Sequence, residues 1–226
     1  MKLEICDITK RCDTAEIRYS ETVESGQMLV IAGHSGSGKS TVLRMIAGLI
    51  PCEGGKIVLD GKDITCEKPS KRSVGMLFQS HALFPHMNVL ENVAYGLRCR
   101  GVRKKPALEQ AYEFLKNFSF NEMDAFVKRF PDEISGGEAQ RVSIARTLIV
   151  KPAVVLFDEP FSSLDVPLRK KLMEEIGSWQ KETGFIGIFV THDINEAKII
   201  ADKVTVLRKG RQVWSGSPKE FGEHLL

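Results

Sequence analysis

The strongest structural signal in this chain is a glycine-rich stretch at residues 33–41, which reads Gly-His-Ser-Gly-Ser-Gly-Lys-Ser-Thr. It follows the apolar run at residues 28–32, which is short enough for a buried strand. Apolar residues at helical spacing come after it: Val42, Leu43, Ile46 and Leu49. A strand, a glycine-rich turn and a helix in this order are the setting that a phosphate-binding loop requires.

Each part of the spacing G-x-x-x-x-G-K-S has a physical role. Glycines let backbone N–H groups curl around phosphates, and the helix N-terminus adds partial positive charge. Lys39 would reach the β- and γ-phosphates, and the Ser40 hydroxyl would bind Mg²⁺. The nucleotide-binding residues predicted here are Gly33, His34, Ser35, Gly36, Ser37, Gly38, Lys39, Ser40 and Thr41. A flexible glycine turn with a chance lysine is the alternative, but it does not explain the flanking strand and helix.

Composition narrows the class of protein. The 226 residues are 42% hydrophobic and 27% charged, which suits one ordinary α/β domain with a full core. A net charge of +3 is too close to balance to favour nucleic acid as a partner. The 5 cysteines are scattered without C-x-x-C spacing, as expected in a reducing cytoplasm. The sequence shows no signal peptide and no run of about 20 apolar residues, so any membrane crossing would be supplied by another chain.

Polar residues follow three further apolar runs. Asp158 and Glu159 end the run that starts at Val154, where Asp158 would hold Mg²⁺, directly or through water, and Glu159 would deprotonate an attacking water. Gln79 ends the run at residues 74–78. His192 follows the run at residues 185–190, at the strand end where such sheets bind ligands, although a lone histidine is more often structural.

The pattern between these strands changes to helical from about Asn88. We expect a single domain, with a nucleotide-binding core at residues 1–87 and 136–226 and an inserted all-helical subdomain at residues 88–135. Residues 3–8 and 14–19 predict two short strands of an antiparallel flap around Cys12-Asp13. The insertion contains a basic cluster, for which a solvated loop is favoured over contact with lipid headgroups or an acidic partner. Its members are Arg98, Arg100, Arg103, Lys104 and Lys105.

A second glycine-containing segment, Ser135-Gly136-Gly137-Glu138, opens another helix. Serine and two glycines at a helix start form an anion-binding nest, and the alternative is an ordinary N-cap. The order of all these motifs resembles the ATP-binding subunits of ABC transporters over nearly the whole chain. The motifs that carry this resemblance are residues 33–41, Gln79, residues 135–141, Asp158-Glu159, Ser162-Ser163-Leu164-Asp165 and His192.

The resemblance implies an α/β fold with a P-loop NTPase core and a mostly parallel sheet. It also implies a head-to-tail dimer with an identical or closely related subunit, in which each ATP lies between the phosphate loop of one copy and residues 135–138 of the other. Ser135 and Gly137 would touch the γ-phosphate, and Asp165 would lie across the dimer interface. Nucleotide-binding residues are thus extended to Ser135, Gly136, Gly137, Glu138 and Asp165.

The same resemblance assigns the chemistry. Gln79 would sense Mg²⁺ and the attacking water, and His192 would grip the γ-phosphate. The implied catalytic residues are Glu159, His192, Gln79 and Lys39, and the implied metal ligands are Ser40, Gln79 and Asp158. Two departures from the family pattern stand out: Ile134 and Glu138 flank Ser-Gly-Gly where the family usually has leucine and glutamine, and Cys12 stands where an aromatic residue normally stacks on adenine. Tyr19 is the nearest aromatic residue in the sequence.

Residues 83–93 are similar to those of bacterial importers of inorganic ions, polyamines, thiamine or sugars, and residues 18–24 favour the thiamine type. The function implied is an energy-coupling ATPase on the inner face of the cell membrane, with permease subunits and an extracytoplasmic substrate-binding protein as partners. A soluble ABC-type ATPase acting on DNA or ribosomes is the alternative, disfavoured by the single cassette. A small-molecule kinase leaves Ser-Gly-Gly unexplained. Leu83, Phe84, Pro85 and Met87 are expected either to dock the permease or to seal the subdomain core.

Overall fold

The computed structural model describes residues 1–12, 15–118, 120–162 and 164–226. Asp13 of the predicted turn and Ser163 of the predicted Ser-Ser-Leu-Asp motif lie outside the described residues. Contacts between residues divide the chain into two units. Unit 1 comprises Met1–Met76, Ala153–Glu159 and Arg169–Leu226, and unit 2 comprises Leu77–Pro152 and Pro160–Leu168.

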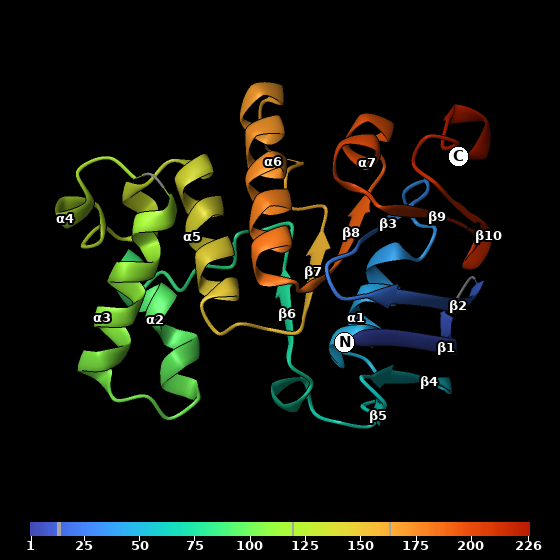
Figure 1. Ribbon diagram of the computed structural model, residues 1–226, viewed down its shortest axis with the longest axis horizontal. Coiled ribbons are helices and arrows are strands. Elements are labelled where there is room, and N and C mark those ends of the chain that lie inside the picture. Colours follow the sequence, from blue (N-terminus) through green and yellow to red (C-terminus); the bar gives the residue numbers. More distant parts are fainter. Residues whose placement is uncertain (13–14, 119, 163) are drawn as a thin grey trace. The chain divides into compact units, whose positions relative to one another are not determined.

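Among the described residues, the strands form one ten-stranded sheet in the order β5-β4-β1-β2-β10-β9-β3-β8-β7-β6 (Figure 1). The strands are β1 (Lys2–Cys12), β2 (Ala15–Glu24), β3 (Met28–Ala32), β4 (Gly54–Leu59), β5 (Lys62–Asp63), β6 (Val74–Leu77), β7 (Val154–Asp158), β8 (Ile186–Thr191), β9 (Lys203–Arg208) and β10 (Arg211–Gly216).

The centre of the sheet is parallel. Strand β3 pairs in parallel with β8 and β9, and β8 pairs in parallel with β7. Strands β3, β7 and β8 are buried at every residue, which is typical of parallel strands covered on both faces. Antiparallel pairs β1–β2, β1–β4 and β4–β5 continue the sheet beyond β10, with longer flap strands than the sequence predicts. The predicted α/β class with a mostly parallel sheet is confirmed.

Helices of unit 1 include α1 (Lys39–Ala47) and α7 (Ile194–Ile200), and α6 (Val166–Thr183) begins in unit 2 and continues in unit 1. Unit 2 contains α2 (Val89–Cys99), α3 (Lys104–Leu115), α4 (Met123–Phe126) and α5 (Gly136–Leu148). The 3₁₀ turns are η1 (Pro69–Lys71), η2 (Lys116–Phe118), η3 (Pro131–Glu133) and η4 (Glu223–Leu225). No helix in the described part of the chain combines the length and the apolar character needed to cross a membrane.

Helix α1 joins the phosphate loop to the core of unit 1. Val42, Leu43 and Ile46 are fully buried, as the helical spacing predicts, but Leu49 is 48% exposed. The helix ends at Ala47, and Gly48 follows with a left-handed φ of 75°, so the chain turns before Leu49 could continue the apolar face. The prediction that Leu49 continues the apolar stripe of this helix is therefore wrong.

Helix α5 packs against α2 and α3. Its apolar stripe is buried in unit 2, including Val142, Ala145 and Leu148. Contacts thus group α5 with the helices of residues 88–135, whereas the sequence division at residue 136 groups it with the nucleotide-binding core. The reason is that helical spacing shows that α5 has a buried face, but not which element covers that face.

Candidate functional site

The phosphate loop connects β3 to α1 and passes close to two strands. Gly33 and Gly38 have φ values of 150° and 104°, in the range that favours glycine. A Cβ atom at Gly33 would overlap the carbonyl oxygen of Leu207, and one at Gly38 would lie 3.0 Å from Ile17 Cδ1. Leu207 of β9 and Ile17 of β2 therefore shape the loop, and sequence reasoning missed both because each lies far from the loop in the chain.

Lys39 is 4% exposed and lies inside the loop. Its Nζ donates hydrogen bonds to the carbonyl oxygens of Gly33 at 2.7 Å and His34 at 2.9 Å. Burial lowers the pKa of the Lys39 ammonium, and the carboxylates of Glu159 and Asp158 partly offset this effect. The amine is therefore held where phosphates in the loop would meet it, with two acidic side chains close by.

The loop is joined to the acidic end of β7 by a direct contact. Ser40 Oγ, in the first turn of α1, donates a hydrogen bond to Asp158 Oδ1 at 2.7 Å. Asp158 is 8% exposed, so its carboxylate is largely withdrawn from water. A hydroxyl and a carboxylate oxygen in contact form a donor set that fits Mg²⁺, a hard cation that prefers oxygen ligands.

Glu159 and His192 meet at the carboxyl ends of β7 and β8. His192 Nδ1 lies 3.4 Å from Glu159 Oε2, with the His192 side chain 66% exposed and the Glu159 side chain 25% exposed. Glu159 has a φ of 45°, an unfavourable conformation for a residue other than glycine. Strain of this kind gathers at functional sites, where the surroundings hold it in place. The structure thus brings the predicted general base and the predicted γ-phosphate ligand together.

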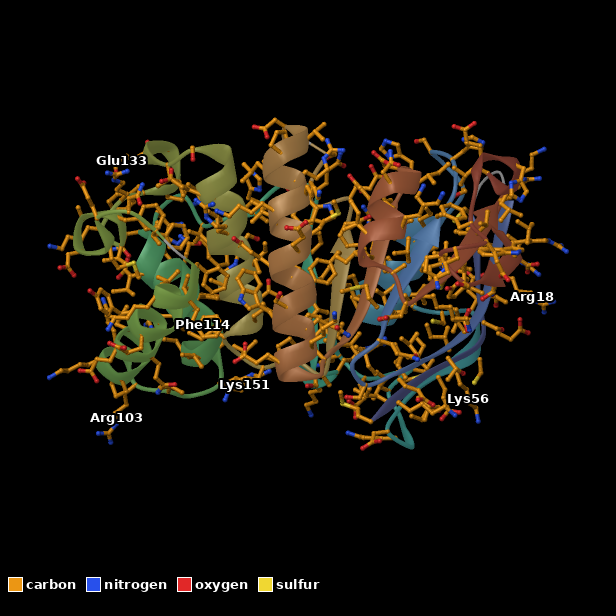
Figure 2. All side chains as sticks on the ribbon, turned by 45° about the horizontal axis from the view of Figure 1, so that its top comes forward. Arg18, Lys56, Arg103, Phe114, Glu133 and Lys151 are labelled. Carbon is orange, nitrogen blue, oxygen red and sulfur yellow. The ribbon has the colours of Figure 1, made fainter. Side chains whose placement is uncertain are left out.

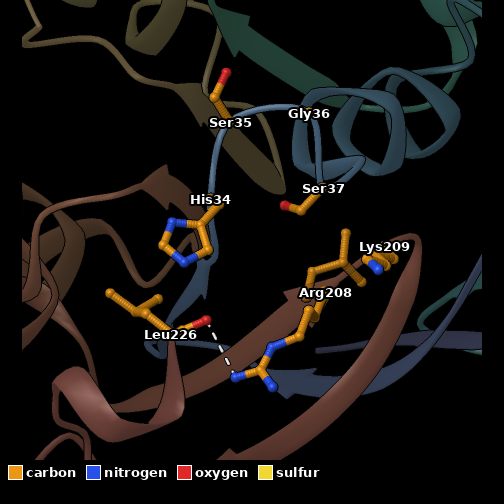
Figure 3. Close-up of a pocket in the computed structure, with 8 residues that line it drawn as sticks. His34, Ser35, Gly36, Ser37, Arg208, Lys209 and Leu226 are labelled. Carbon is orange, nitrogen blue, oxygen red and sulfur yellow. Dashed lines mark hydrogen bonds between the residues drawn. The ribbon is translucent and has the colours of Figure 1, made fainter.

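A pocket of about 570 Å³ opens beside the loop (Figure 3). Its walls are formed by the loop, the end of β9 and the last residue of the chain. The lining residues are His34, Ser35, Gly36, Ser37, Leu207, Arg208, Lys209 and Leu226. Arg208 Nη2 donates a hydrogen bond to the Leu226 carbonyl oxygen at 3.1 Å, drawn as a dashed line in Figure 3. With Arg208 and Lys209 in its wall, the pocket is suited to an anionic ligand.

The other predicted site residues belong to unit 2. Gln79 Nε2 donates a hydrogen bond to Ser162 Oγ at 3.3 Å. Asp165 Oδ1 accepts one from the backbone N–H of Leu168 at 2.9 Å. A Cβ atom at Gly137 would lie 2.6 Å from Leu168 Cδ2, so Gly137 and Asp165 both lie against Leu168.

Ser135 is the N-cap of α5 and forms a capping box with Glu138. Glu138 Oε2 accepts hydrogen bonds from the Ser135 N–H at 2.8 Å and from Ser135 Oγ at 2.7 Å, and Ser135 Oγ accepts one from the Glu138 N–H. Burial alone would raise the pKa of Glu138, but the bonds from Ser135 prevail and lower it. The N-cap interpretation is thus confirmed, and anion binding at this segment stays a prediction.

On the predicted base-binding side, Cys12 is exposed at the end of β1. Tyr19 is 1% exposed, and its hydroxyl is hydrogen-bonded to Thr205 Oγ1 at 2.9 Å. Burial raises the pKa of the Tyr19 phenol well above its ordinary range. A ring enclosed in the core in this way cannot stack on a nucleobase.

Known proteins provide an independent comparison. A family model described as "ABC transporter" matches residues 18–162. The chain is 45% identical over 210 residues to an "Fe(3+) ions import ATP-binding protein" of Agrobacterium fabrum, covering 93% of this chain and 59% of that protein. It is 43% identical over 223 residues to a "Spermidine/putrescine import ATP-binding protein" of Aggregatibacter actinomycetemcomitans, covering 98% and 59%. The chain therefore spans about three fifths of the length of these curated relatives.

Proposed function

Because the chain belongs to the ABC transporter family, we propose that it is an ATP-hydrolysing subunit that couples nucleotide turnover to import across a membrane. The observation that carries this proposal is the contact between Ser40 and Asp158, which joins the phosphate loop to the acidic strand end that also bears Glu159. A loop that only bound nucleotide would not need a strained carboxylate beside it.

The proposed chemistry follows from these residues. Loop N–H groups and the Lys39 ammonium would hold the phosphates of ATP. Ser40 and Asp158 would hold Mg²⁺, which supplies positive charge next to the phosphate oxygens when it is bound. Glu159 would accept a proton from the attacking water as its oxygen bonds to the γ-phosphorus, and the bond to the ADP oxygen breaks to release ADP and phosphate. His192, beside Glu159, would hold the γ-phosphate.

A second copy, or a closely related subunit, would complete the site. Ser135, Gly136, Gly137 and Glu138 would meet the γ-phosphate of the ATP bound by the other subunit, and Asp165 would lie across the interface. Gln79 would respond to Mg²⁺ and the attacking water. This arrangement is supported by the two helix N-termini in one chain that are suited to anions, at α1 and α5. A nucleotide bound in the phosphate loop of the same chain would use only the N-terminus of α1.

Partners are proposed from the relatives and from a surface of unit 2. The relatives are named as import proteins for iron ions and for spermidine/putrescine, and their similar identities of 45% and 43% do not select a cargo for this chain. A permease would dock near Phe84, where a pocket of about 440 Å³ lies beside the Tyr95 ring. An extracytoplasmic binding protein would deliver the cargo, and this subunit would act at the inner membrane face. The near-balanced net charge of +3 favours no role on nucleic acid.

Two substitutions test the function. Glu159→Gln should keep ATP binding but lower kcat by about 100-fold or more, because the amide keeps the shape and removes the base. Lys39→Ala should instead weaken nucleotide binding. Glu174→Gln, at a surface carboxylate that is 61% exposed, is the matched control for Glu159→Gln and should leave kcat unchanged. Fluorescent-nucleotide binding and phosphate release give the two readouts. Full turnover in Glu159→Gln would refute the assignment of the base.

A further inference from the structure

A buried carboxylate lies just beyond His192 and has no role in the chemistry described so far. Glu196, in the first turn of α7, is 7% exposed. Its Oε1 accepts a hydrogen bond from Arg169 Nη1 of α6 at 3.0 Å, and its Oε2 accepts one from Thr191 Oγ1. A carboxylate withdrawn from water is costly unless it is paired and hydrogen-bonded, and both of its oxygens are used here.

This carboxylate is linked to both neighbours of His192, directly to Thr191 and through Arg169 to Asp193. Thr191 Oγ1, while donating to Glu196, accepts a hydrogen bond from the Asp193 N–H at 3.0 Å. Asp193 caps α7 by accepting from the N–H groups of Asn195 at 2.7 Å and Glu196 at 3.4 Å. Arg169 Nη1 also lies 3.8 Å from Asp193 Oδ2. The backbone before and after His192 is therefore tied to one ion pair, in which Glu196 is buried and Arg169 is partly exposed.

His192 itself needs such support. Its side chain is 66% exposed, so core packing restricts it little, and yet Nδ1 lies 3.4 Å from Glu159 Oε2. An exposed imidazole holds one direction only if its backbone is held. Among the described contacts, Thr191, Asp193 and Glu196 all lie within four residues of His192, so these contacts support this short segment. An ion pair that merely joined α6 to α7 would not need to pass through Thr191 and Asp193.

We propose that Arg169 and Glu196 are positioning residues that hold the 191–193 segment so that His192 points at Glu159 and at the γ-phosphate. Only the part of the proposal that concerns the γ-phosphate rests on the proposed ATPase function. The orientation of His192 toward Glu159 is a property of the chain without nucleotide. Catalytic groups must be held closely, because a displacement of about 1 Å can cost about 100-fold in rate.

The test compares steady-state kinetics with the NMR signal of the His192 imidazole in nucleotide-free protein, assigned with His192→Asn. Glu196→Ala should lower kcat by about tenfold or more and leave KM for ATP within about twofold, because the phosphate loop is untouched. The His192 signal should shift and broaden. Glu196→Gln, whose amide oxygen can still accept from Thr191, should keep kcat within about threefold. Lys170→Met, at the next residue of α6 and 65% exposed, is the control and should change neither readout.

A kcat within about twofold of the original in folded Glu196→Ala, or an unmoved His192 signal, would overturn the proposal. Where Glu196→Ala fails to fold, Arg169→Lys replaces it, because lysine keeps the charge but loses the planar fork. That variant should lower kcat by about threefold or more and shift the His192 signal, and an unchanged signal would overturn the proposal. If His192→Asn retains full kcat, the assigned role of His192 fails, while the NMR signal still decides whether the pair positions the ring.

Discussion

At the position expected to face the nucleobase, this chain presents the small thiol of Cys12, exposed at the end of β1. Tyr19 cannot replace the missing aromatic ring, because that ring is enclosed and its hydroxyl is bonded to Thr205. Base–aromatic stacking contributes about 1–3 kcal/mol where it has been measured by substitution. Binding should therefore depend mainly on the triphosphate, which the loop contacts and which does not distinguish one base from another.

We expect weak selectivity for adenine as a result. GTP should compete with ATP within about tenfold, a difference of about 1.4 kcal/mol. Cys12→Trp should tighten the binding of both nucleotides by supplying a stacking surface. Cys66→Trp, at another exposed cysteine, is the control and should change neither affinity. Competition with a fluorescent ATP analogue measures all three proteins, and a preference for ATP well beyond tenfold would reveal a base-reading contact elsewhere.

The lowered pKa of Glu138 makes the stability of the fold depend on pH. Bonds from Ser135 hold the pKa of Glu138 below its ordinary value of 4.5 in the folded chain, so the unfolded chain binds this proton more readily. The carboxylate therefore stabilises the fold above pH 4.5, and this contribution is lost as pH falls through the lowered pKa.

Glu138→Ala should lower the free energy of unfolding by about 0.5–1.5 kcal/mol at pH 7, the usual net contribution of an intramolecular hydrogen bond, because the bonds from Ser135 to the carboxylate are lost. The gap between the two proteins should narrow as pH falls below 4.5. Urea unfolding followed by circular dichroism at several pH values measures this difference in the free energy of unfolding. A gap that stays constant down to pH 3, or widens, would show that the carboxylate of Glu138 does not carry the stabilisation.

At the scale of elements, the segment between β6 and α2 is held on two sides. Asn92 of α2 is fully buried, accepts a hydrogen bond from the Phe84 N–H at 2.8 Å and donates one to the Met87 carbonyl oxygen at 2.9 Å. Arg146 of α5 donates to the Ala82 carbonyl oxygen at 2.8 Å, and its guanidinium lies 5.2 Å from the centre of the Phe84 ring. Phe84 is thus presented on an anchored segment, beside Tyr95 at 4.6 Å between ring centres.

An anchored, half-buried aromatic ring beside a pocket suits a groove for a helix from another protein. We predict that Phe84→Ala leaves the basal ATPase of the isolated subunit within about twofold, whereas transport by the assembled complex falls about tenfold, equal to about 1.4 kcal/mol of coupling. Phe130→Ala, at a ring that is 42% exposed in the same unit, is the control. Paired assays measure the ATPase of the isolated subunit and transport by the complex with permease in liposomes. Equal losses of ATPase activity and of transport would assign Phe84 to packing.

The basic cluster around Arg103 is the next surface to consider if Phe84 proves to be packing. Arg103 extends away from the helices (Figure 2). Lys104 is paired with Glu91 at 3.3 Å and also lines the pocket near Tyr95. All five residues of the cluster are exposed, as predicted, but Arg98 lies in α2 and Lys104 and Lys105 lie in α3, so the prediction of a loop is wrong for these three. Arg98 and Lys104 also form part of the rim of the pocket proposed for docking.

At the level of the whole molecule, we expect from the two helix N-termini suited to anions that two chains complete one ATPase site. The loop residues Lys39 and Ser40 belong to unit 1, and the capped start of α5 at Ser135 belongs to unit 2. If the start of α5 is used only when a partner chain brings its ATP, the isolated subunit should be monomeric without ATP and dimeric with it when hydrolysis is blocked.

Light scattering on Glu159→Gln tests this directly. Its mass should double on adding ATP with Mg²⁺, because nucleotide bound in the loop of one copy would be met by Ser135 of the other. Adding Lys39→Ala to the same protein should abolish the change, since nucleotide binding is lost. A mass that stays that of a monomer at high protein and ATP concentrations would contradict the shared site.

Features that depend on neighbouring residues could be predicted from the sequence. The phosphate loop, the buried run at Val154, the capped start of α5 at Ser135 and the helical face of Val42 and Ile46 all depend on residues within a few positions of one another. Spacing, glycine placement and capping chemistry are legible at that range. Even there, Leu49 was misjudged, because the left-handed Gly48 ends the helix before it.

The folded structure was needed to establish the contacts between distant parts of the chain. It placed Ile17 and Leu207 against the loop, enclosed Tyr19 beside Thr205, grouped α5 with α2 and α3, and joined Arg169 to Glu196. The sequence offers many possible contact partners for each of these side chains and does not show which one is used. Packing selects the partner, because a buried polar group must form its hydrogen bond with one of the few residues that the fold brings within reach.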